Sequence, residues 1–480
     1  MAHGAAIVWL RQDLRTEDNP ALSEAVKRGG PVVPVYVYAP QEEGDSAPGA
    51  ASRYWLHRSL KSLQETLEKA GSRLIVRRGN SREELEAVAR SVDAGAVFWN
   101  RRYEPGITRR DESIKRVFEE RGLEVRSFNG SLLLEPWEVT TRQGEPYKVF
   151  TPFWKACLEK LDPAEPLAAP RKVPAPGSWP KSLRVESLEL QPEPDWAGGI
   201  REAWAFGEAA AHARLESFLN ESLPAYLDGR DQPAKDDTSR MSPYLHFGEI
   251  SPRQLWHGVQ AAASAHNSRG ALRGAEKYLS ELGWREFSYN LLYNFPHLPH
   301  KPMQEKFGAF PWGRDDEAQE AWQRGRTGYP IVDAGMRQLW KTGWMHNRVR
   351  MIVASLLTKD LLIPWQQGAA WFWDTLVDAD LANNTQGWQW TAGCGADAAP
   401  YFRIFNPVSQ GERYDPKGDY IRQWVPEIAA LPDKWIHKPW EAPRDVLHGA
   451  RVALDKTYPS PIIEHSEARV RALAAYQQIR

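Results

Sequence analysis

Short apolar runs alternate with amphipathic stretches through the N-terminal part of the chain, up to about residue 130. The runs are rich in β-branched and aromatic side chains and are bounded by Gly, Pro or polar residues, which predicts strands; the stretches between them predict helices. This alternation predicts a doubly wound parallel sheet with helices on both faces, an α/β domain. The predicted strands are Ala5–Leu10, Val32–Tyr38, Arg73–Arg78, Ala96–Asn100 and Leu123–Phe128, and the predicted helices are Asp18–Arg28, Arg53–Ala70, Ser81–Ser91 and Thr108–Arg121.

Two local patterns refine this prediction. Ser81 and Glu84 have the Ser-x-x-Glu spacing of a capping box, which would start a helix. After the first strand the sequence is Trp9–Arg15 (WLRQDLR), and no Gly-x-Gly-x-x-Gly stands there. The phosphate-binding fingerprint of a dinucleotide domain is therefore missing, and the fold is better predicted than any ligand of this region.

A proline-rich segment follows the α/β pattern. Eight prolines fall between residues 161 and 196, a density at which neither a helix nor a strand pattern survives. Trp179 and Trp196 offer apolar anchors, so we expect this connector to lie extended on the surface. We place the α/β domain at 1–133, the connector at 134–205 and a second domain at 206–480.

Long patterns with helical spacing dominate from about Phe206 onward, and strand signals are nearly absent. This predicts an all-α second domain. The predicted helices are Gly207–Asn220, Pro252–Ala265, Leu272–Tyr293, Asp333–Thr342, Asn347–Leu361 and Gln366–Leu376.

Composition narrows the class of protein. The 61 Lys and Arg residues balance 62 Asp and Glu, which excludes a wholesale polycation but leaves room for a local patch that binds nucleic acid. The mean hydropathy is −0.57, and no run approaches the roughly 18 to 20 apolar residues of a membrane span. No secretory signal is visible and the two cysteines cannot build a disulfide framework, so the reducing cytoplasm is the expected setting.

Tryptophan is the unusual component, with 22 residues, 14 of them between Trp256 and Trp440. Because indoles are large and pack well, most are expected to be core. Four polar motifs within or before this region could carry chemistry.

The first motif is Thr238–Pro243 (TSRMSP), where Ser242 is a plausible N-cap and Pro243 a plausible first helical residue. Its hydroxyls and backbone N–H groups could hold an anion; a simple cap with a solvated Arg240 is the alternative. The second motif is Glu281–Phe287, in which Glu281 and Arg285 have the i, i+4 spacing of an ion pair. A surface pair over a packed Trp284 is the alternative there.

The third motif is Gly343–Arg350, whose two arginines lie on one helical turn and point different ways. The fourth is Asp378–Trp390, rich in carboxylates, amides and indoles in an otherwise apolar region. Such a cluster is costly to bury unless it binds something polar. Asp378 or Asp380 could pair with Arg350, although pairs of this kind with a purely structural role are commoner.

Two further patterns are discounted. Gly393–Ala398 matches Gly-x-Gly-x-x-Ala but follows no strand-like run and opens no helix. His297 and His300 flank a proline and have no further ligands nearby in sequence, so we expect no metal site.

Taken together, these motifs resemble the DNA photolyase/cryptochrome family over nearly the whole chain. Trp9–Arg15 is similar to that family's first strand–helix junction. The more specific C-terminal motifs occur in family order: Thr238–Ser242, Trp284–Phe287, Thr327–Ala334, Gly343–Arg348, Trp388–Trp390 and Asp397–Pro407.

The resemblance implies that the helical domain holds FAD in a bent shape. Arg350 and Asp378 would pair beside the flavin ring, and Asp380 would contact the flavin or its ribityl chain. Asn384 would face the reactive ring nitrogen, where asparagine suits a repair enzyme. The remaining implied cofactor contacts, mostly to the phosphates, are Tyr226, Thr238, Ser239, Arg240, Met241, Ser242, Asn347 and Ala379.

The resemblance also implies light-driven repair of cyclobutane pyrimidine dimers by an electron from photoexcited reduced FAD, in single- or double-stranded DNA. Trp388, Trp365 and Trp312 would carry electrons from the surface to the flavin. Glu281 would stabilise charge on the thymine carbonyls, and Trp284 would stack on the flipped-out bases. The other implied substrate and DNA contacts are Arg230, Arg285, Met345, Asn347, Arg348, Arg403 and Gln410.

An antenna chromophore is implied near Tyr103–Pro105 and His300–Lys301, either methenyltetrahydrofolate, which we favour, or 8-hydroxydeazaflavin. A cryptochrome-type photoreceptor and a (6-4) photolyase are alternatives within the family. Outside it, a helical flavoprotein electron carrier would need neither Arg230 nor the Glu281 and Trp284 pocket. We expect a monomer with no obligate protein partner.

Overall fold

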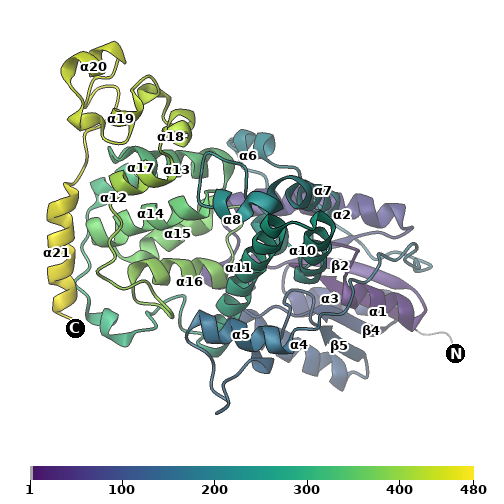
Figure 1. Cartoon of the computed structure of the whole chain (residues 1–480). Coiled ribbons are helices and arrows are strands. Elements are labelled where there is room, and N and C mark those ends of the chain that lie inside the picture. Colours follow the sequence, from purple (N-terminus) through teal and green to yellow (C-terminus); the bar gives the residue numbers. More distant parts are fainter. Residues whose placement is uncertain (1–3) are drawn as a thin grey trace.

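The computed structural model describes residues 4–480 and contains two domains joined side by side (Figure 1). The N-terminal domain is built on a five-stranded sheet of order β3-β2-β1-β4-β5 in which every pairing is parallel, so the predicted doubly wound sheet is confirmed. Its strands are β1 (Ala5–Leu10), β2 (Val32–Tyr38), β3 (Ile75–Arg78), β4 (Ala94–Asn100) and β5 (Glu124–Phe128).

Side chains of β1 alternate between two apolar cores because successive strand residues point to opposite faces. Ala6 and Val8 pack in the core that contains helices α1 (Pro20–Arg28) and α2 (Ala50–Lys69). Ile7 and Trp9 pack in the core that contains α3 (Ser81–Ser91) and α4 (Pro105–Glu120). The sheet is therefore covered on both faces, as its continuous apolar strands require.

The N-terminal cap of α3 differs from the sequence prediction. The N-cap of α3 is Asn80, whose side chain accepts a hydrogen bond from the Glu83 amide at 3.1 Å. Ser81 instead donates its hydroxyl to Glu42, so the predicted capping box is wrong, because a carboxylate from the loop after β2 takes the serine.

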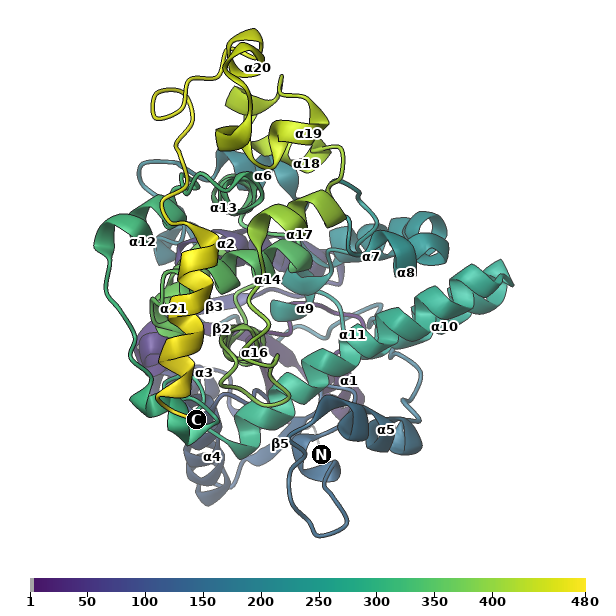
Figure 2. The same cartoon turned by 60° about the vertical axis from the view of Figure 1, so that its left-hand side comes forward.

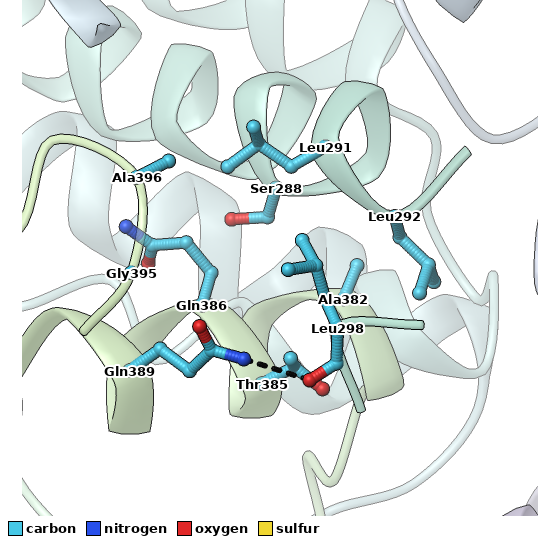
Figure 3. Close-up of a pocket in the computed structure, with 10 residues that line it drawn as sticks. All are labelled: Ser288, Leu291, Leu292, Leu298, Ala382, Thr385, Gln386, Gln389, Gly395 and Ala396. Atoms are coloured by element: carbon cyan, nitrogen blue, oxygen red, sulfur yellow. Dashed lines mark hydrogen bonds between the residues drawn. The ribbon is translucent and has the colours of Figure 1, made fainter. Parts of the chain in front are cut away.

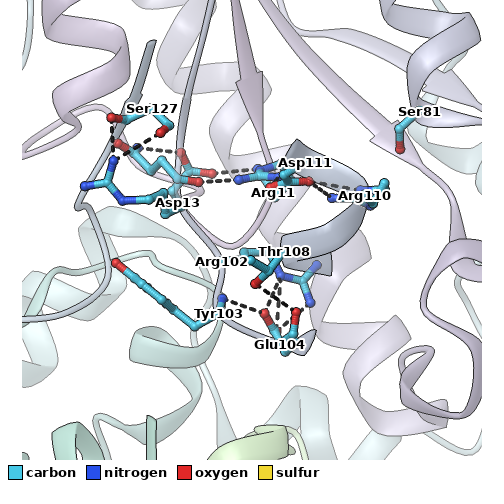
Figure 4. Close-up of polar contacts among 12 residues, drawn as sticks. Arg11, Asp13, Ser81, Arg102, Tyr103, Glu104, Thr108, Arg110, Asp111 and Ser127 are labelled. Carbon is cyan, nitrogen blue, oxygen red and sulfur yellow. Dashed lines mark hydrogen bonds and ion pairs between the residues drawn. The ribbon is translucent and has the colours of Figure 1, made fainter. Parts of the chain in front are cut away.

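The carboxyl ends of β1 and β4 are filled by polar side chains of the protein itself (Figure 4). Arg11 pairs with Asp111 at 2.6 Å, and the Arg11 guanidinium lies 4.3 Å from the Trp9 ring. Asn100 donates to Asp13 at 2.7 Å. This edge is where the strand order reverses and where doubly wound sheets usually hold ligands. Here the ion pairs occupy it, in agreement with the missing glycine fingerprint.

The connector is fixed to the α/β domain by backbone hydrogen bonds. Val32 donates to Pro174, Val173 donates to Ala70 and Leu183 donates to Val76. The proline-rich part therefore lies extended on the domain. Trp179 packs against the sheet core, whereas Trp196 is 44% exposed and is a weaker anchor than predicted. The connector region also contains the helix α5 (Phe150–Lys160), which the proline density did not predict.

The C-terminal domain is helical, and its last helix lies at the edge far from the sheet (Figures 1 and 2). Helices α7 and α14 continue into single π-helical turns, Phe218–Ser222 and Leu356–Asp360, which explains why the predicted helices there were longer. The helices are α6 (Gly198–Ala203), α7 (Glu208–Ser217), α8 (Tyr226–Gly229), α9 (Ser242–His246), α10 (Pro252–His266), α11 (Arg269–Asn294), α12 (Asp316–Gln323), α13 (Pro330–Thr342), α14 (Asn347–Ser355), α15 (Trp365–Thr375), α16 (Leu381–Ala392), α17 (Pro407–Tyr414), α18 (Asp419–Trp424), α19 (Asp433–Ile436), α20 (Arg444–Gly449) and α21 (His465–Gln477). No helix within residues 4–480 is both long and apolar enough to cross a membrane.

A buried carboxyl group joins the two domains. Glu249 accepts hydrogen bonds from Trp55 Nε1 at 3.1 Å and Ser59 Oγ at 2.6 Å on α2, and from the Gly207 amide at 2.8 Å. The side chain is fully buried, and burial raises its pKa to about 7 despite these donors. Gly248 beside it has φ +65°, and a Cβ there would lie 2.1 Å from the Gln12 carbonyl oxygen. The domains therefore meet too closely for any side chain at that position.

A second junction lies at the start of α7. Both carboxylate oxygens of Glu208 accept hydrogen bonds from residues 16 and 17 of the α/β domain. Glu17, Glu208 and His212 also offer ligand atoms within 4.8 Å of one another. Because Glu208 already holds backbone N–H groups, its evident role is to fasten the loop after β1 to the helical domain.

We expect Glu249→Ala to lower the free energy of unfolding by about 3 kcal/mol, since it leaves three buried donors without an acceptor. Denaturant unfolding followed by circular dichroism measures this loss. The matched control is Ser59→Ala, which removes a single donor and should cost about 1 kcal/mol. Equal losses in the two variants would contradict the role of Glu249 as the shared acceptor.

The same pair of proteins tests the pKa of Glu249. A carboxyl group with a raised pKa binds its proton more tightly in the folded state, so its contribution to stability falls as the pH rises from its ordinary value of 4.5 to about 7. The stability gap between the native chain and Glu249→Ala should therefore narrow between about pH 5 and about pH 8. A gap that widens over this range would show that the carboxyl group is not destabilised by burial.

Candidate functional site

A buried ion pair lies at the centre of the helical domain. Arg350 on α14 donates Nη2 to both oxygens of Asp378, at 2.8 and 3.2 Å. The same carboxylate accepts the hydroxyl of Ser242 on α9 at 2.6 Å, and its side chain is only 2% exposed. Arg350 also donates Nε to the Met345 carbonyl at 2.8 Å. Of the two candidates, Asp378 is thus the partner of Arg350, and it ties three separate segments together.

Asp380 has a different role, as the N-cap of α16. It accepts the Asn383 amide at 2.8 Å and the Asn383 side chain at 2.7 Å, and it also accepts the Tyr289 hydroxyl. Burial alone would raise the pKa of Asp380, but the facing donors and charges, first His246 and then Arg285, hold it well below its usual range. Asp380 is therefore a fixed negative charge at the start of α16, and Ala379 lies buried between it and Asp378.

The hydroxyl-rich loop 238–242 is held by groups from two helices. Arg214 on α7 donates to the carbonyls of Ser239 and Thr238 at 2.9 and 2.8 Å. Tyr278 on α11 donates its hydroxyl to Ser239 Oγ at 3.1 Å, and Tyr226 packs edge-on against Tyr278. Sequence reasoning missed Arg214, because nothing in the sequence distinguishes it from any other arginine on a helix.

Within this loop the predicted cap is displaced by one residue. Met241 is the N-cap of α9, Ser242 is its first residue, and Pro243 is the next. Ser242 is therefore free to use its hydroxyl on Asp378 rather than on the helix. Arg240 has φ +52°, a left-handed conformation that turns the chain sharply before the helix.

Asn384 lies one turn into α16. Its side chain donates Nδ2 to the Ala369 carbonyl on α15 at 3.1 Å, which fixes the amide and leaves its oxygen as an acceptor. Asn347, the first residue of α14, is exposed.

The three tryptophans predicted as an electron path lie in one apolar cluster. Trp388 is 3% exposed and Trp365 2%, whereas Trp312 is only partly buried and packs at the cluster's margin. Trp388 also contacts Phe372 and Trp322, with ring centroids 5.0 and 6.2 Å apart. Burial thus separates Trp312, which is nearest the surface, from Trp388 and Trp365, and the electron path stays a prediction.

Glu281 pairs with residues other than the predicted Arg285. Its carboxylate lies 2.6 Å from Arg230 Nη1 and 2.7 Å from Lys277 Nζ. Arg285 is 9% exposed and donates to the Ser131 carbonyl at 2.7 Å. The predicted pair is wrong, because the Ser131 carbonyl and Glu286 draw Arg285 into the domain junction. Arg285 is buried there, so it is also not available for the predicted contact with DNA.

Trp284 is stacked on Phe150, with ring centroids 3.8 Å apart and planes 9° from parallel. Phe150 is the first residue of α5, and it is buried. One face of the indole is therefore covered by a rigid partner, and any ligand that stacks must use the other. Phe150 was not predicted, because it lies in the connector region.

The methionine at this site differs from the predicted one. Met345 is fully buried in the core, with its sulfur against Gly335, so it is not available to a ligand. Met351 lies one turn after Asn347 on the same face of α14 and is partly exposed, with its sulfur 3.9 Å from Arg348 Nη1.

Glu281, Trp284, Asn347 and Met351, all at least partly exposed, are called the rim below. Further basic and polar side chains lie on neighbouring elements. Arg348 pairs with Asp231 at 2.9 Å, and its guanidinium lies 4.4 Å from the Tyr414 ring on α17. Arg403 is exposed beside Phe405, and Gln410 is partly exposed on α17. The loop after α8, α14 and α17 are thus neighbours, which places Arg230, Arg348 and Gln410 on adjoining elements, while Arg403 precedes α17.

Two pockets lie further along α11. The first lies between α11 and α16, where Gln389 donates to the Leu298 carbonyl at 2.7 Å (Figure 3). Ten residues line it: Ser288, Leu291, Leu292, Leu298, Ala382, Thr385, Gln386, Gln389, Gly395 and Ala396. The second pocket is at the domain junction and includes Tyr103, Glu104 and His246. Gly393 is the C-cap of α16 and has a left-handed conformation. The segment Gly393–Ala398 therefore follows a helix and not a strand, as the discounted dinucleotide pattern would require.

Comparison with known proteins identifies the relatives of this arrangement. Residues 6–174 match the family model described as DNA photolyase, and residues 278–478 match the FAD binding domain of DNA photolyase. A deoxyribodipyrimidine photo-lyase of Agrobacterium fabrum is 49% identical over 99% of this chain and 98% of its own length. Cryptochrome-1 of Arabidopsis thaliana is 41% identical over 99% of this chain and 70% of its own length. The crystal structure of a bacterial class III photolyase from Agrobacterium tumefaciens superposes with a TM-score of 0.96 at 48% identity, covering 100% of this chain and 98% of that one.

We expect Arg350→Met to destabilise the fold by about 3 to 5 kcal/mol, because it leaves the buried charge of Asp378 without a partner. Adding Asp378→Asn should restore part of that loss. The matched control is Arg348→Met on the same helix, whose partner Asp231 is 37% exposed, so the cost should be about 1 kcal/mol or less. Denaturant unfolding measures all three, and equal losses for the two single variants would contradict the central role of the Arg350 pair.

Proposed function

The chain belongs to the DNA photolyase and cryptochrome family, and from that premise we propose that it is a deoxyribodipyrimidine photo-lyase that repairs cyclobutane pyrimidine dimers with light. The observation that carries the proposal is that the Glu281 carboxylate and the Trp284 indole lie three residues apart on α11 and are both partly exposed. The 49% identity with a photo-lyase over nearly the full length supports the same reaction.

The residues of the helical domain fit FAD. Asp378 and Asn384 offer acceptors to a flavin ring, and loop 238–242 offers hydroxyls to phosphates. Nε2 of His346 is buried without a hydrogen-bond partner among the described residues, whereas Nδ1 of His246 lies 3.9 Å from Asp380 Oδ2. Unpaired buried polar atoms are rare in folded proteins, and a polar ligand would satisfy them.

We assign the cofactor contacts by element. Ser239, Arg240, Met241 and Ser242 face the phosphates, and Tyr226 and Thr238 support that end. Asn347, Arg350, Asp378, Ala379, Asp380 and Asn384 surround the ring and ribityl chain. When bound and reduced, FAD would supply cyclic one-electron transfer under light: an electron would go to the dimer, and it would return to the flavin once the cyclobutane ring has split. Asn384, held by Ala369, presents its amide oxygen to the ring nitrogen.

The rim residues bind and orient the lesion. Trp284, held flat against Phe150, stacks on the flipped-out bases. Glu281 hydrogen-bonds the base edges and stabilises charge that develops on the carbonyls. Asn347 and Met351 complete the pocket. Arg230, Arg348, Arg403 and Gln410 contact the DNA backbone, which positions the strand without reading its sequence.

A photoreceptor role is the second candidate. It is favoured by the 41% identity with Cryptochrome-1 of Arabidopsis thaliana, of which this chain covers 70%. The presence of the Glu281 and Trp284 pair, together with Asn384, favours repair. A (6-4) photolyase is less favoured, because residues 344–347 (WMHN) contain a single histidine.

For the antenna we propose methenyltetrahydrofolate at the domain junction, with 8-hydroxydeazaflavin as the alternative. Tyr103 and Tyr289 form an edge-on aromatic contact there, with centroids 6.0 Å apart, beside the second pocket. The edge of β1 and β4 is blocked by the Arg11 and Asp111 pair, which favours a chromophore between the domains. We also propose that the protein acts as a monomer in the cytoplasm, with damaged DNA as its partner.

The decisive experiment is repair of a thymine-dimer oligonucleotide under blue light by purified, reduced protein. We expect dimers to be lost only in the light. In Trp284→Ala, affinity for the dimer should fall by about ten- to a hundredfold, because one stacking contact is worth roughly 1 to 3 kcal/mol.

Two controls separate binding from electron supply. Trp340→Ala removes an exposed indole and should leave dimer binding and repair unchanged. Trp388→Phe should retain repair by chemically reduced protein but slow the light-driven reduction of oxidised flavin, followed by its absorbance. No light-dependent loss of dimers in the native protein would refute the function.

The antenna proposal predicts a second chromophore in the purified protein. Extraction followed by an absorption spectrum should identify a folate. A deazaflavin spectrum would overturn the choice, and a preparation with flavin alone, even after incubation with the folate, would overturn the antenna site itself.

A further inference from the structure

Two cations meet on one oxygen of Glu281. Arg230 Nη1 donates to Oε1 at 2.6 Å, and Lys277 Nζ lies 2.7 Å from the same oxygen. Within residues 4–480, Oε2 has no hydrogen-bond or ion-pair partner in the protein. The carboxylate is thus anchored through one oxygen and presents the other.

The two cations differ in how they are held. Arg230 lies in the loop after α8, where the Tyr226 ring is 5.7 Å from its guanidinium. Burial lowers the pKa of Arg230, but the Glu281 carboxylate more than offsets this and raises it above its ordinary value. Lys277 lies on α11 itself, one turn before Glu281, and therefore moves with it.

The ion pair between Lys277 and Glu281 contributes little to the stability of α11. At i, i+4 spacing the order glutamate then lysine is the favourable one, and here the order is reversed. Both side chains are also partly exposed, at 34% and 28%, where ion pairs contribute little to stability. Helix stability therefore does not account for the pair of Lys277 and Glu281, and its effect on the orientation of the Glu281 carboxylate remains to be considered.

DNA introduces a competitor for Arg230. A backbone phosphate and the Glu281 carboxylate compete for the Arg230 guanidinium, because arginine binds either group well. When Arg230 turns to a phosphate, Glu281 loses its first anchor. Lys277 then remains as the cation at Oε1.

We propose that Lys277 is a positioning residue that keeps Glu281 Oε1 anchored while Arg230 binds the DNA backbone, so that Oε2 stays directed at the lesion. This rests on the proposed function, because it takes the lesion as the ligand of Glu281. Lys277 thereby sets discrimination between damaged and undamaged DNA, without itself contacting phosphate.

The test is a binding comparison with the holoprotein in the dark, using a thymine-dimer oligonucleotide and its undamaged counterpart. Lys277→Met should weaken binding of the damaged strand by about three- to tenfold and leave undamaged binding within about twofold. Lys277→Arg should restore it. Arg273→Met, an exposed residue about one turn earlier on α11, is the matched control and should change neither.

Two further readouts separate positioning from a direct phosphate contact or a folding defect. A lost phosphate contact would weaken both DNAs equally and reduce the slope of log affinity against log salt by about 0.9. Positioning leaves that slope unchanged, and Lys277→Met should have no further effect in a Glu281→Gln background. Equal loss on both DNAs, a reduced slope, or additivity with Glu281→Gln would each overturn the proposal.

Failure of this inference is distinguishable from failure of the function. If the native protein does not prefer damaged DNA, the proposed function fails. If it does prefer damaged DNA and Lys277→Met retains the full preference, only the role of Lys277 fails.

Discussion

The buried pair between Arg350 and Asp378 is the interaction on which the helical domain's site depends. A carboxylate that is 2% exposed must be fully paired, and here it accepts two hydrogen bonds from Arg350 Nη2 and one from Ser242. These partners come from α14 and α9, and Asp378 itself precedes α16. One desolvated charge therefore fixes the spacing between the hydroxyl loop, the start of α16 and α14, which are the elements that would surround a flavin.

The second constraint is the contact between the domains. Glu249 is buried against α2 of the α/β domain, and Glu208 fastens the loop after β1. Arg285 and Asp380 lie on the helical side of the same junction, so the polar groups near the cofactor site and those between the domains form one continuous region. A chromophore between the domains would therefore lie close to the charges that hold α16.

The net charge of −1 does not show where the cations lie or how they are paired. Two of the cations on the rim are not free in the protein alone: Arg230 is paired with Glu281, and Arg348 with Asp231. DNA phosphates must compete with these carboxylates, which couples binding of the backbone to the state of the lesion pocket. A near-neutral protein can thus present a basic surface that becomes available only to a polyanion.

The sequence by itself determined the two-domain plan, because strand and helix periodicities depend on local patterns of apolar residues. It also predicted the residues of a flavin site and a tryptophan path, through motifs that are long enough to be recognised. It failed where a side chain chooses among distant partners. Arg285 turns to the Ser131 carbonyl rather than to Glu281, and Ser81 turns to Glu42 rather than to its own helix. Phe150 and Arg214 gained their roles only from tertiary structure, since each contacts a separate element, which no local pattern encodes. The i, i+4 pair of Lys277 and Glu281 is local, but only the fold shows that Arg230 shares the same oxygen.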